Sequence, residues 1–152
     1  PFATELFDKD GEKLREKGKE FGSTTGRSRR TGWLDLVALK YAITLNGVTD
    51  LIMMKSDVLD GFRTLKVAVA YLIDGKETDR VPYDAHIPVT PIYKEFRGWD
   101  TDLSKIRSEE ELPAEFLHFI RFIEDSVGLP VKILSVGPDR EQTIVREIFN
   151  HG

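Results

Sequence analysis

A helical pattern of hydrophobic residues begins at residue 34. One stripe of apolar side chains recurs at spacings of three and four residues: Leu34, Val37, Ala38, Tyr41, Ala42 and Leu45. This spacing predicts a helix. Because Leu36, Leu39 and Ile43 occupy its other faces, we expect the helix to be well buried. The pair Asn46-Gly47 is typical of a helix C-terminus and predicts its end.

A second helical pattern lies nearer the C-terminus. Its apolar residues again recur at helical spacing: Phe116, Phe119, Ile120, Ile123 and Val127. Pro113 suits the first turn of this helix, and Gly128 followed by Pro130 predicts its end. The carboxylates from Glu109 to Glu111 precede it. Since negative charge is favourable near a helix N-terminus, we interpret them as structural.

Three apolar runs predict strands, at residues 51–54, 67–73 and 131–134. The second run is almost entirely apolar, which is typical of a central strand covered on both faces. Asp74-Gly75 then predicts a hairpin, with an antiparallel return strand reaching Val81. We expect residues 82–100 to form an extended surface segment and residues 139–147 to be helical. The alternation of helices and strands predicts an α/β fold, and no repeat or linker divides residues 1–152.

The composition narrows the classes of function. Lys and Arg total 22 against 26 Asp and Glu, a net charge of −4. Binding to nucleic acid or to an anionic membrane needs a basic face, so we expect neither partner. The absence of cysteine excludes disulfides, thiolate catalysis and zinc–thiolate sites. No signal peptide or membrane-spanning apolar run occurs, which favours a cytoplasmic location, and His86, His118 and His151 lack the spacing of metal ligands.

A basic segment interrupts this acidic chain at residues 23–30: Ser23, Thr24, Thr25, Gly26, Arg27, Ser28, Arg29 and Arg30. In an extended loop Arg27 and Arg29 face the same side, and their guanidinium groups can clamp one carboxylate or phosphate. Gly26 allows the backbone to approach a ligand closely. A solvated loop paired with surface carboxylates explains the same composition, so the residues alone leave both interpretations open.

Two further segments follow predicted strands. Lys55, Ser56 and Asp57 end the first strand, where an aspartate can accept two hydrogen bonds from guanine while a lysine stem lies across the base. The K-x-D spacing is not specific: this composition gives about one match by chance, and a helix start explains it too. The other segment comprises Ser135, Val136 and Gly137. These residues could line a base pocket, or form a strand-to-helix turn capped by Asp139.

Taken in order, three segments resemble the C-terminal part of adenylosuccinate synthetase: FGSTTGRSRRTGWLDLVALKYA, KSDVLDGF and SVGPDREQTI. PFATELFD and IRSEEELP resemble the same family, so the resemblance covers essentially the whole chain. It implies the C-terminal part of a P-loop-NTPase-like mixed β-sheet flanked by helices, with an antiparallel hairpin. It also implies that the family's N-terminal part is absent. That part carries its phosphate loop, its catalytic Asp and His, and most of its IMP and magnesium contacts.

The function implied by the resemblance is GTP-dependent ligation of IMP and L-aspartate to adenylosuccinate, in purine and AMP biosynthesis. Residues 23–29 would form the aspartate loop, with Thr25, Arg27 and Arg29 nearest the substrate carboxylates. Arg27 would also reach the ribose of IMP, and Arg29 the GTP phosphates. The remaining GTP-binding residues would be Lys55, Ser56, Asp57, Ser135, Val136 and Gly137. No catalytic or metal-binding residue is expected in this segment.

Several expectations follow for the whole protein. Mg²⁺ would be bound by the missing N-terminal part, this chain alone would be inactive, and the full-length enzyme would be a homodimer. Ser28, Thr31 and Met54 depart from the Pro, Cys and Thr frequent in the family, but none of these departures removes an expected contact.

Two other classes of function stay open. The chain could be a stand-alone module that binds a nucleotide or dicarboxylate without catalysis. It could also be an interaction or nucleic-acid domain that uses Arg27, Arg29 and Arg30 as a basic patch, which the acidic net charge disfavours.

Overall fold

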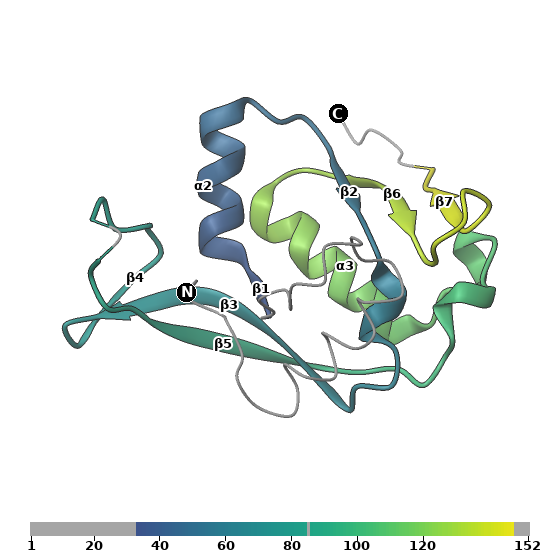
Figure 1. Ribbon diagram of the computed structural model, residues 1–152, viewed down its shortest axis with the longest axis horizontal. Helices are drawn as coiled ribbons and strands as arrows, with labels where there is room; N and C mark the ends of the chain where they lie inside the picture. The colour runs from purple at the N-terminus through teal and green to yellow at the C-terminus, as the bar shows by residue number, and fades with distance from the viewer. Residues whose placement is uncertain (1–32, 85, 148–152) are drawn as a thin grey trace, which may run out of the picture. The chain divides into compact units, whose positions relative to one another are not determined.

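The computed structural model divides the chain into two compact units, each built from two separate stretches (Figure 1). The first comprises Pro1–Gly47 and Thr64–Phe96, and the second comprises Val48–Arg63 and Arg97–Gly152. Within these units the structure describes residues 33–84 and 86–147. None of the helices in these two ranges is long and apolar enough to cross a membrane.

Among its described residues, the first unit has a mixed four-stranded sheet and one helix, with the sheet centred on β3 (Thr64–Ile73). This strand pairs in parallel with β1 (Leu34–Asp35) and antiparallel with β4 (Lys76–Thr78). It also pairs with β5 (Thr90–Arg97). Most of its apolar residues are buried, namely Leu65, Val67, Ala68, Ala70 and Tyr71, whereas Leu72 near its end is 38% exposed. The prediction of a buried central strand is therefore confirmed, whereas part of the expected surface segment at residues 82–100 forms β5.

The hairpin between β3 and β4 is confirmed. Asp74 and Gly75 have φ angles of 49° and 76°, so both central residues adopt the positive φ that a two-residue type I′ turn requires. The return strand is shorter than predicted, since β4 ends at Thr78 rather than Val81.

The helix of the first unit, α2 (Leu36–Asn46), begins two residues later than its hydrophobic stripe. Leu34 belongs to β1, and the Asp35 carboxylate caps the helix by accepting a hydrogen bond from Ala38 N at 3.1 Å. The helix ends at Gly47, whose φ of 62° is left-handed, as predicted. The prediction of a well-buried helix is wrong. Only the first turn of α2 is buried, and its later apolar residues Tyr41 and Leu45 are 51% and 64% exposed.

The second unit contains a three-stranded sheet of order β2–β6–β7 (Figure 1). β2 (Leu51–Met53) runs parallel to β6 (Val131–Ser135), and β7 (Thr143–Val145) runs antiparallel to β6. The prediction of a helix at residues 139–147 is therefore wrong, and Asp139 caps none. Ile144 is buried and pairs with Leu134, while its neighbours point outward, which is the two-residue period of a strand.

The core of the second unit is covered by α3 (Ala114–Val127), which ends at the left-handed Gly128 as its pattern predicts. Phe116, Phe119, Ile120 and Ile123 are the buried residues of this helix. Trp99 meets Phe116 edge-on, with ring centroids 5.0 Å apart. The described residues of this unit also form three 3₁₀ helices: η1 (Ser56–Leu59), η2 (Leu103–Lys105) and η3 (Glu109–Glu111). This mixed sheet and helix arrangement confirms the predicted α/β class.

Candidate functional site

The carboxyl ends of β2 and β6 lie side by side in the second unit (Figure 1). The two strands are parallel neighbours, and their last paired residues are Met53 and Leu134. Residues 55–57, here called the KSD segment, and residues 135–137, the SVG segment, therefore lie at the same edge of the sheet. Open α/β sheets bind their ligands at this kind of edge. The sequence-predicted residues 23–29 lie outside the described residues.

The KSD segment turns sharply out of β2. Lys55 has φ 53° and ψ 43°, a left-handed conformation that a side chain with a Cβ rarely adopts. Its carbonyl accepts a hydrogen bond from Val58 N at 3.1 Å, which starts η1. The segment is thus a helix start, as one interpretation of the sequence held. The same turn also puts Asp57 in the first turn of η1, a short helix that contacts β6.

Ser56 is the most buried residue of the KSD segment, at 1% exposure. Its hydroxyl oxygen is inaccessible and has no hydrogen-bond partner within the described part of the chain. Leaving a buried hydroxyl unsatisfied costs about 1–3 kcal/mol. A polar group in this position is typical of a site that meets a ligand or another part of a larger fold.

The SVG segment is a tight turn at the end of β6. Ser135 Oγ donates to Gly137 O at 3.3 Å, and Val136 N donates to Gln142 O at 2.8 Å. A β-carbon at Gly137 would stand 2.3 Å from the side-chain carbon Cδ of Gln142, so it would displace that side chain from its present position. The turn leads back into β7 and not into a helix, so the backbone groups of residues 135–137 stay at the sheet edge.

Sequence reasoning missed Gln142, which shapes this turn. Its backbone N–H donates to Asp139 O, and its side-chain Oε1 accepts from Asp139 N, each at 2.9 Å. Its Nε2 donates to Ser104 O at 3.0 Å. Ser104 lies 38 residues before Gln142, so no local pattern in the sequence connects the two. The only signal in the sequence is Gly137, since glycine is typical of a place where another group comes close.

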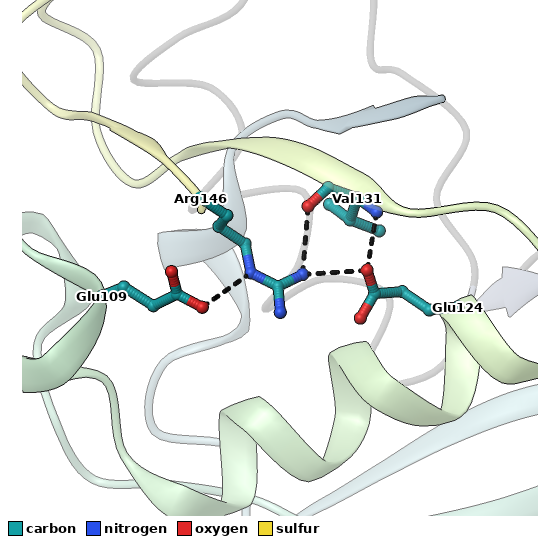
Figure 2. Close-up of polar contacts among 4 residues, drawn as sticks. All are labelled: Glu109, Glu124, Val131 and Arg146. Carbon is teal, nitrogen blue, oxygen red and sulfur yellow. Dashed lines mark hydrogen bonds and ion pairs between the residues drawn. The ribbon is translucent and has the colours of Figure 1, made fainter. Parts of the chain in front are cut away.

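Arg146 and its contacts with Glu109, Glu124 and Val131, here called the Arg146 cluster, connect the sheet of this unit to its helices (Figure 2). Arg146 Nε lies 3.1 Å from Glu109 Oε1, and its Nη1 lies 3.1 Å from Glu124 Oε2 and 3.0 Å from Val131 O. Glu124 Oε2 also accepts a hydrogen bond from Val131 N at 2.8 Å. The Arg146 side chain is only 13% exposed, so these charge-assisted contacts are poorly screened and rigidify the start of β6.

Candidate metal ligands do not cluster in the described part of the chain. Over residues 33–84 and 86–147, no three His, Asp or Glu side chains gather as metal ligands would. His86 and His118 are exposed and far apart in sequence, and His151 lies outside these ranges. The groups at this edge that can recognise a ligand are hydrogen-bonding groups and a lysine.

Comparison with known proteins identifies the family of the chain. The family model for adenylosuccinate synthetase matches residues 1–144. The adenylosuccinate synthetases of Parabacteroides distasonis and Bacteroides fragilis are 58% and 60% identical to it over 146 residues, which is 96% of this chain and 34% of each relative. A solved structure of fully ligated adenylosuccinate synthetase from Plasmodium falciparum matches with a TM-score of 0.90 and 35% identity, covering 97% of this chain and 36% of that one. The chain thus spans about a third of the length of these relatives.

Proposed function

This chain belongs to the adenylosuccinate synthetase family, and we propose that it supplies the guanine-binding edge and the aspartate loop of a GTP-dependent ligase. The ligase would join IMP and L-aspartate into adenylosuccinate, in purine and AMP biosynthesis, with release of GDP and phosphate. The observation that carries the proposal is the meeting of the KSD and SVG segments at the carboxyl ends of the parallel strands β2 and β6.

Guanine recognition follows from the residue types at this edge. The Asp57 carboxylate has two acceptor oxygens, which suit the ring N–H and exocyclic amine of guanine. The Lys55 stem can lie across the base. Ser135, Val136 and Gly137 would contribute their hydroxyl and backbone groups. An adenine base has an acceptor at N1 and no amine at C2, so it offers the Asp57 carboxylate no donor there and the edge selects against it.

The aspartate loop is proposed from the sequence. Ser23, Thr24, Thr25, Gly26 and Ser28 would line it, and Arg27 and Arg29 would clamp the substrate carboxylates. Arg27 would also contact IMP, and Arg29 the GTP phosphates. Phosphoryl transfer depends on hydrogen-bond donors positioned around the transferring group, and these donors would lie elsewhere in the enzyme. The task of the loop would be to hold aspartate beside the activated IMP.

The rest of the machinery would lie in the two thirds of the family's length that this chain does not span. The Mg²⁺ that accompanies GTP would be held there, as the resemblance to the family implies. We propose accordingly that the chain alone is inactive. We also propose that the whole enzyme is a cytoplasmic homodimer.

The test of the guanine assignment uses the full-length protein with Asp57→Asn. Inosine triphosphate lacks the exocyclic amine, so the ratio of kcat/KM for GTP to that for inosine triphosphate measures recognition of this group. We expect the substitution to lower the ratio about tenfold or more, because an amide replaces one acceptor by a donor. Asp125→Asn, on the exposed side of α3, is the matched control. An unchanged ratio in Asp57→Asn rules out the assignment, and tight GTP binding by this chain alone favours the stand-alone module.

A further inference from the structure

We propose that η2 is a bridge that fixes the KSD and SVG segments relative to each other, with Asp60 and Gln142 as positioning residues for guanine selection. The inference rests on the function proposed above and adds to it two residues that do not belong to either segment. It also assigns a role to η2, which lies about 45 residues after one segment and 30 before the other in the sequence.

A bridge is needed because the sheet does not hold these segments directly. The last pair between β2 and β6 is Met53 with Leu134. Residues 55–57 and 136–137 lie beyond this pair, so no hydrogen bond of the β2–β6 ladder sets the distance between them. A base read by both segments requires that distance to be constant, because a misplacement of about 1 Å can cost a factor of about 100 in rate.

The first half of the bridge is Asp60, which directly follows η1. Its Oδ1 accepts a hydrogen bond from Trp99 Nε1 at 2.7 Å, and its Oδ2 accepts one from Leu103 N at 2.9 Å. Gly61 N donates to Trp99 O at 3.2 Å in the same place. Trp99 and Leu103 are 3% and 0% exposed, so Asp60 ties the end of η1 to a rigid, buried part of the unit.

The second half of the bridge is Gln142, which ties the turn after β6 to the same helix. Its Nε2 donates a hydrogen bond to Ser104 O, and Ser104 directly follows Leu103, the residue that Asp60 contacts. Through Oε1 and its backbone the same residue also closes the turn at Asp139 and Val136. One continuous path of hydrogen bonds therefore runs from η1 through Asp60, η2 and Gln142 to the SVG segment.

The function of this path is specificity and not chemistry. If either end loosens, Asp57 and the SVG segment can no longer meet the same guanine ring at once. KM for GTP should then rise, and the discrimination between GTP and inosine triphosphate should decrease. The values of KM for IMP and aspartate, which the proposed function assigns to other segments, stay unchanged.

The test uses the full-length protein and two substitutions at opposite ends of the bridge. Gln142→Leu keeps the size of the side chain and removes its hydrogen bonds. Asp60→Asn keeps the shape of the side chain, but its amide NH₂ group must face Leu103 N or Trp99 Nε1, which are both donors. Each should lower the ratio of kcat/KM for GTP to that for inosine triphosphate about tenfold. The double variant should be no worse than the poorer single one, because both break the same path. Glu141→Leu, an exposed neighbour of Gln142, is the control.

The outcomes separate the bridge from the function it rests on. A ratio of kcat/KM values does not depend on the fraction of enzyme that folds, so reduced yield of a variant leaves the test valid. If Asp57→Asn lowers the ratio but Gln142→Leu and Asp60→Asn do not, the bridge is overturned and the guanine site stands. Independent, multiplying effects of the two substitutions also overturn it. If Asp57→Asn leaves the ratio unchanged, the guanine site and the bridge fail together.

Discussion

The Tyr71 hydroxyl donates a hydrogen bond to Oδ2 of Asp35, whose other oxygen caps the first turn of α2 at Ala38 N. One carboxylate thus connects β3 to the start of α2. Asp35 also belongs to β1 and lies opposite Ala68 in the parallel pairing with β3. The junction fixes where the helix begins, two residues later than the hydrophobic stripe alone predicts.

Tyr71→Phe is expected to destabilise the first unit. The substitution leaves the buried ring in place and removes a hydrogen bond to a charged group, which is worth about 1.5–3 kcal/mol. Tyr41→Phe is the matched control, because Tyr41 is 51% exposed and its hydroxyl should contribute little. Urea unfolding of the full-length protein measures the difference. Equal unfolding free energies for the two variants would contradict the assigned role of Tyr71.

The same hydroxyl predicts a dependence of stability on alkaline pH. Burial raises the pKa of Tyr71 well above its ordinary value near 10, and the hydrogen bond and negative charge of Asp35 raise it further. Its contribution to stability is therefore complete below about pH 10. Above that pH the unfolded state loses the proton first, and stability falls by up to about 1.4 kcal/mol per pH unit.

The measurement compares wild type with Tyr71→Phe from pH 8 to 11, because other groups also titrate in this range. The advantage of the wild type in unfolding free energy should shrink above about pH 10. Parallel curves for the two proteins over the whole range would mean that Tyr71 ionises equally easily in both states.

Local sequence signals predicted the helix ends and the hairpin correctly. Contacts between residues far apart in sequence determined the features that these signals predicted wrongly. The left-handed ends of α2 and α3 at Gly47 and Gly128, and the hairpin at Asp74, are each specified by a few adjacent residues. Residues 139–147 contain charges at helical spacing. Three of them, Thr143–Val145, form β7 instead, where Ile144 pairs with Leu134. Local pattern likewise could not tell how little of α2 the rest of the chain covers.

The candidate site divides in the same way. Residue type and order identified the KSD and SVG segments, but only the parallel pairing of β2 and β6 puts them at one edge. The partners of Asp60 and Gln142 lie 38 to 43 residues away in sequence, and no spacing rule connects them. Whether residues 23–29 join this edge stays a prediction.

Arg146→Met should lower the unfolding free energy by about 2–3 kcal/mol. The substitution keeps the apolar stem and leaves Glu124, which is 18% exposed, without its cation. Lys132→Met is the matched control, since Lys132 pairs with Asp50 at the same 3.1 Å but is 53% exposed. Such a surface pair contributes about 0–1 kcal/mol. Similar losses for the two variants in urea unfolding would show that burial of the Arg146 cluster adds nothing.

Gly137→Ala is expected to damage both stability and guanine selection, through the overlap with Gln142. A β-carbon at residue 137 would stand 2.3 Å from Gln142 Cδ, so the glutamine side chain must leave its place and its hydrogen bond to Ser104. Overlap of this kind in a packed site costs about 1–3 kcal/mol. The ratio of kcat/KM for GTP to that for inosine triphosphate should fall together with the unfolding free energy.

A second substitution separates these two effects. Adding Gln142→Ala to Gly137→Ala removes the overlapping atoms, so the double variant should be about as stable as Gln142→Ala alone. Its discrimination between the nucleotides should stay low, because the contact with Ser104 is still missing.

Gly98→Ala provides the contrast, since its β-carbon would lie 1.7 Å from the backbone oxygen of Phe62, which no side-chain change can relieve. If the losses of stability from Gly137→Ala and Gln142→Ala simply add, the overlap is not their cause. If discrimination returns with stability, Gly137 acts through packing of the turn and not through the contact of Gln142 with η2.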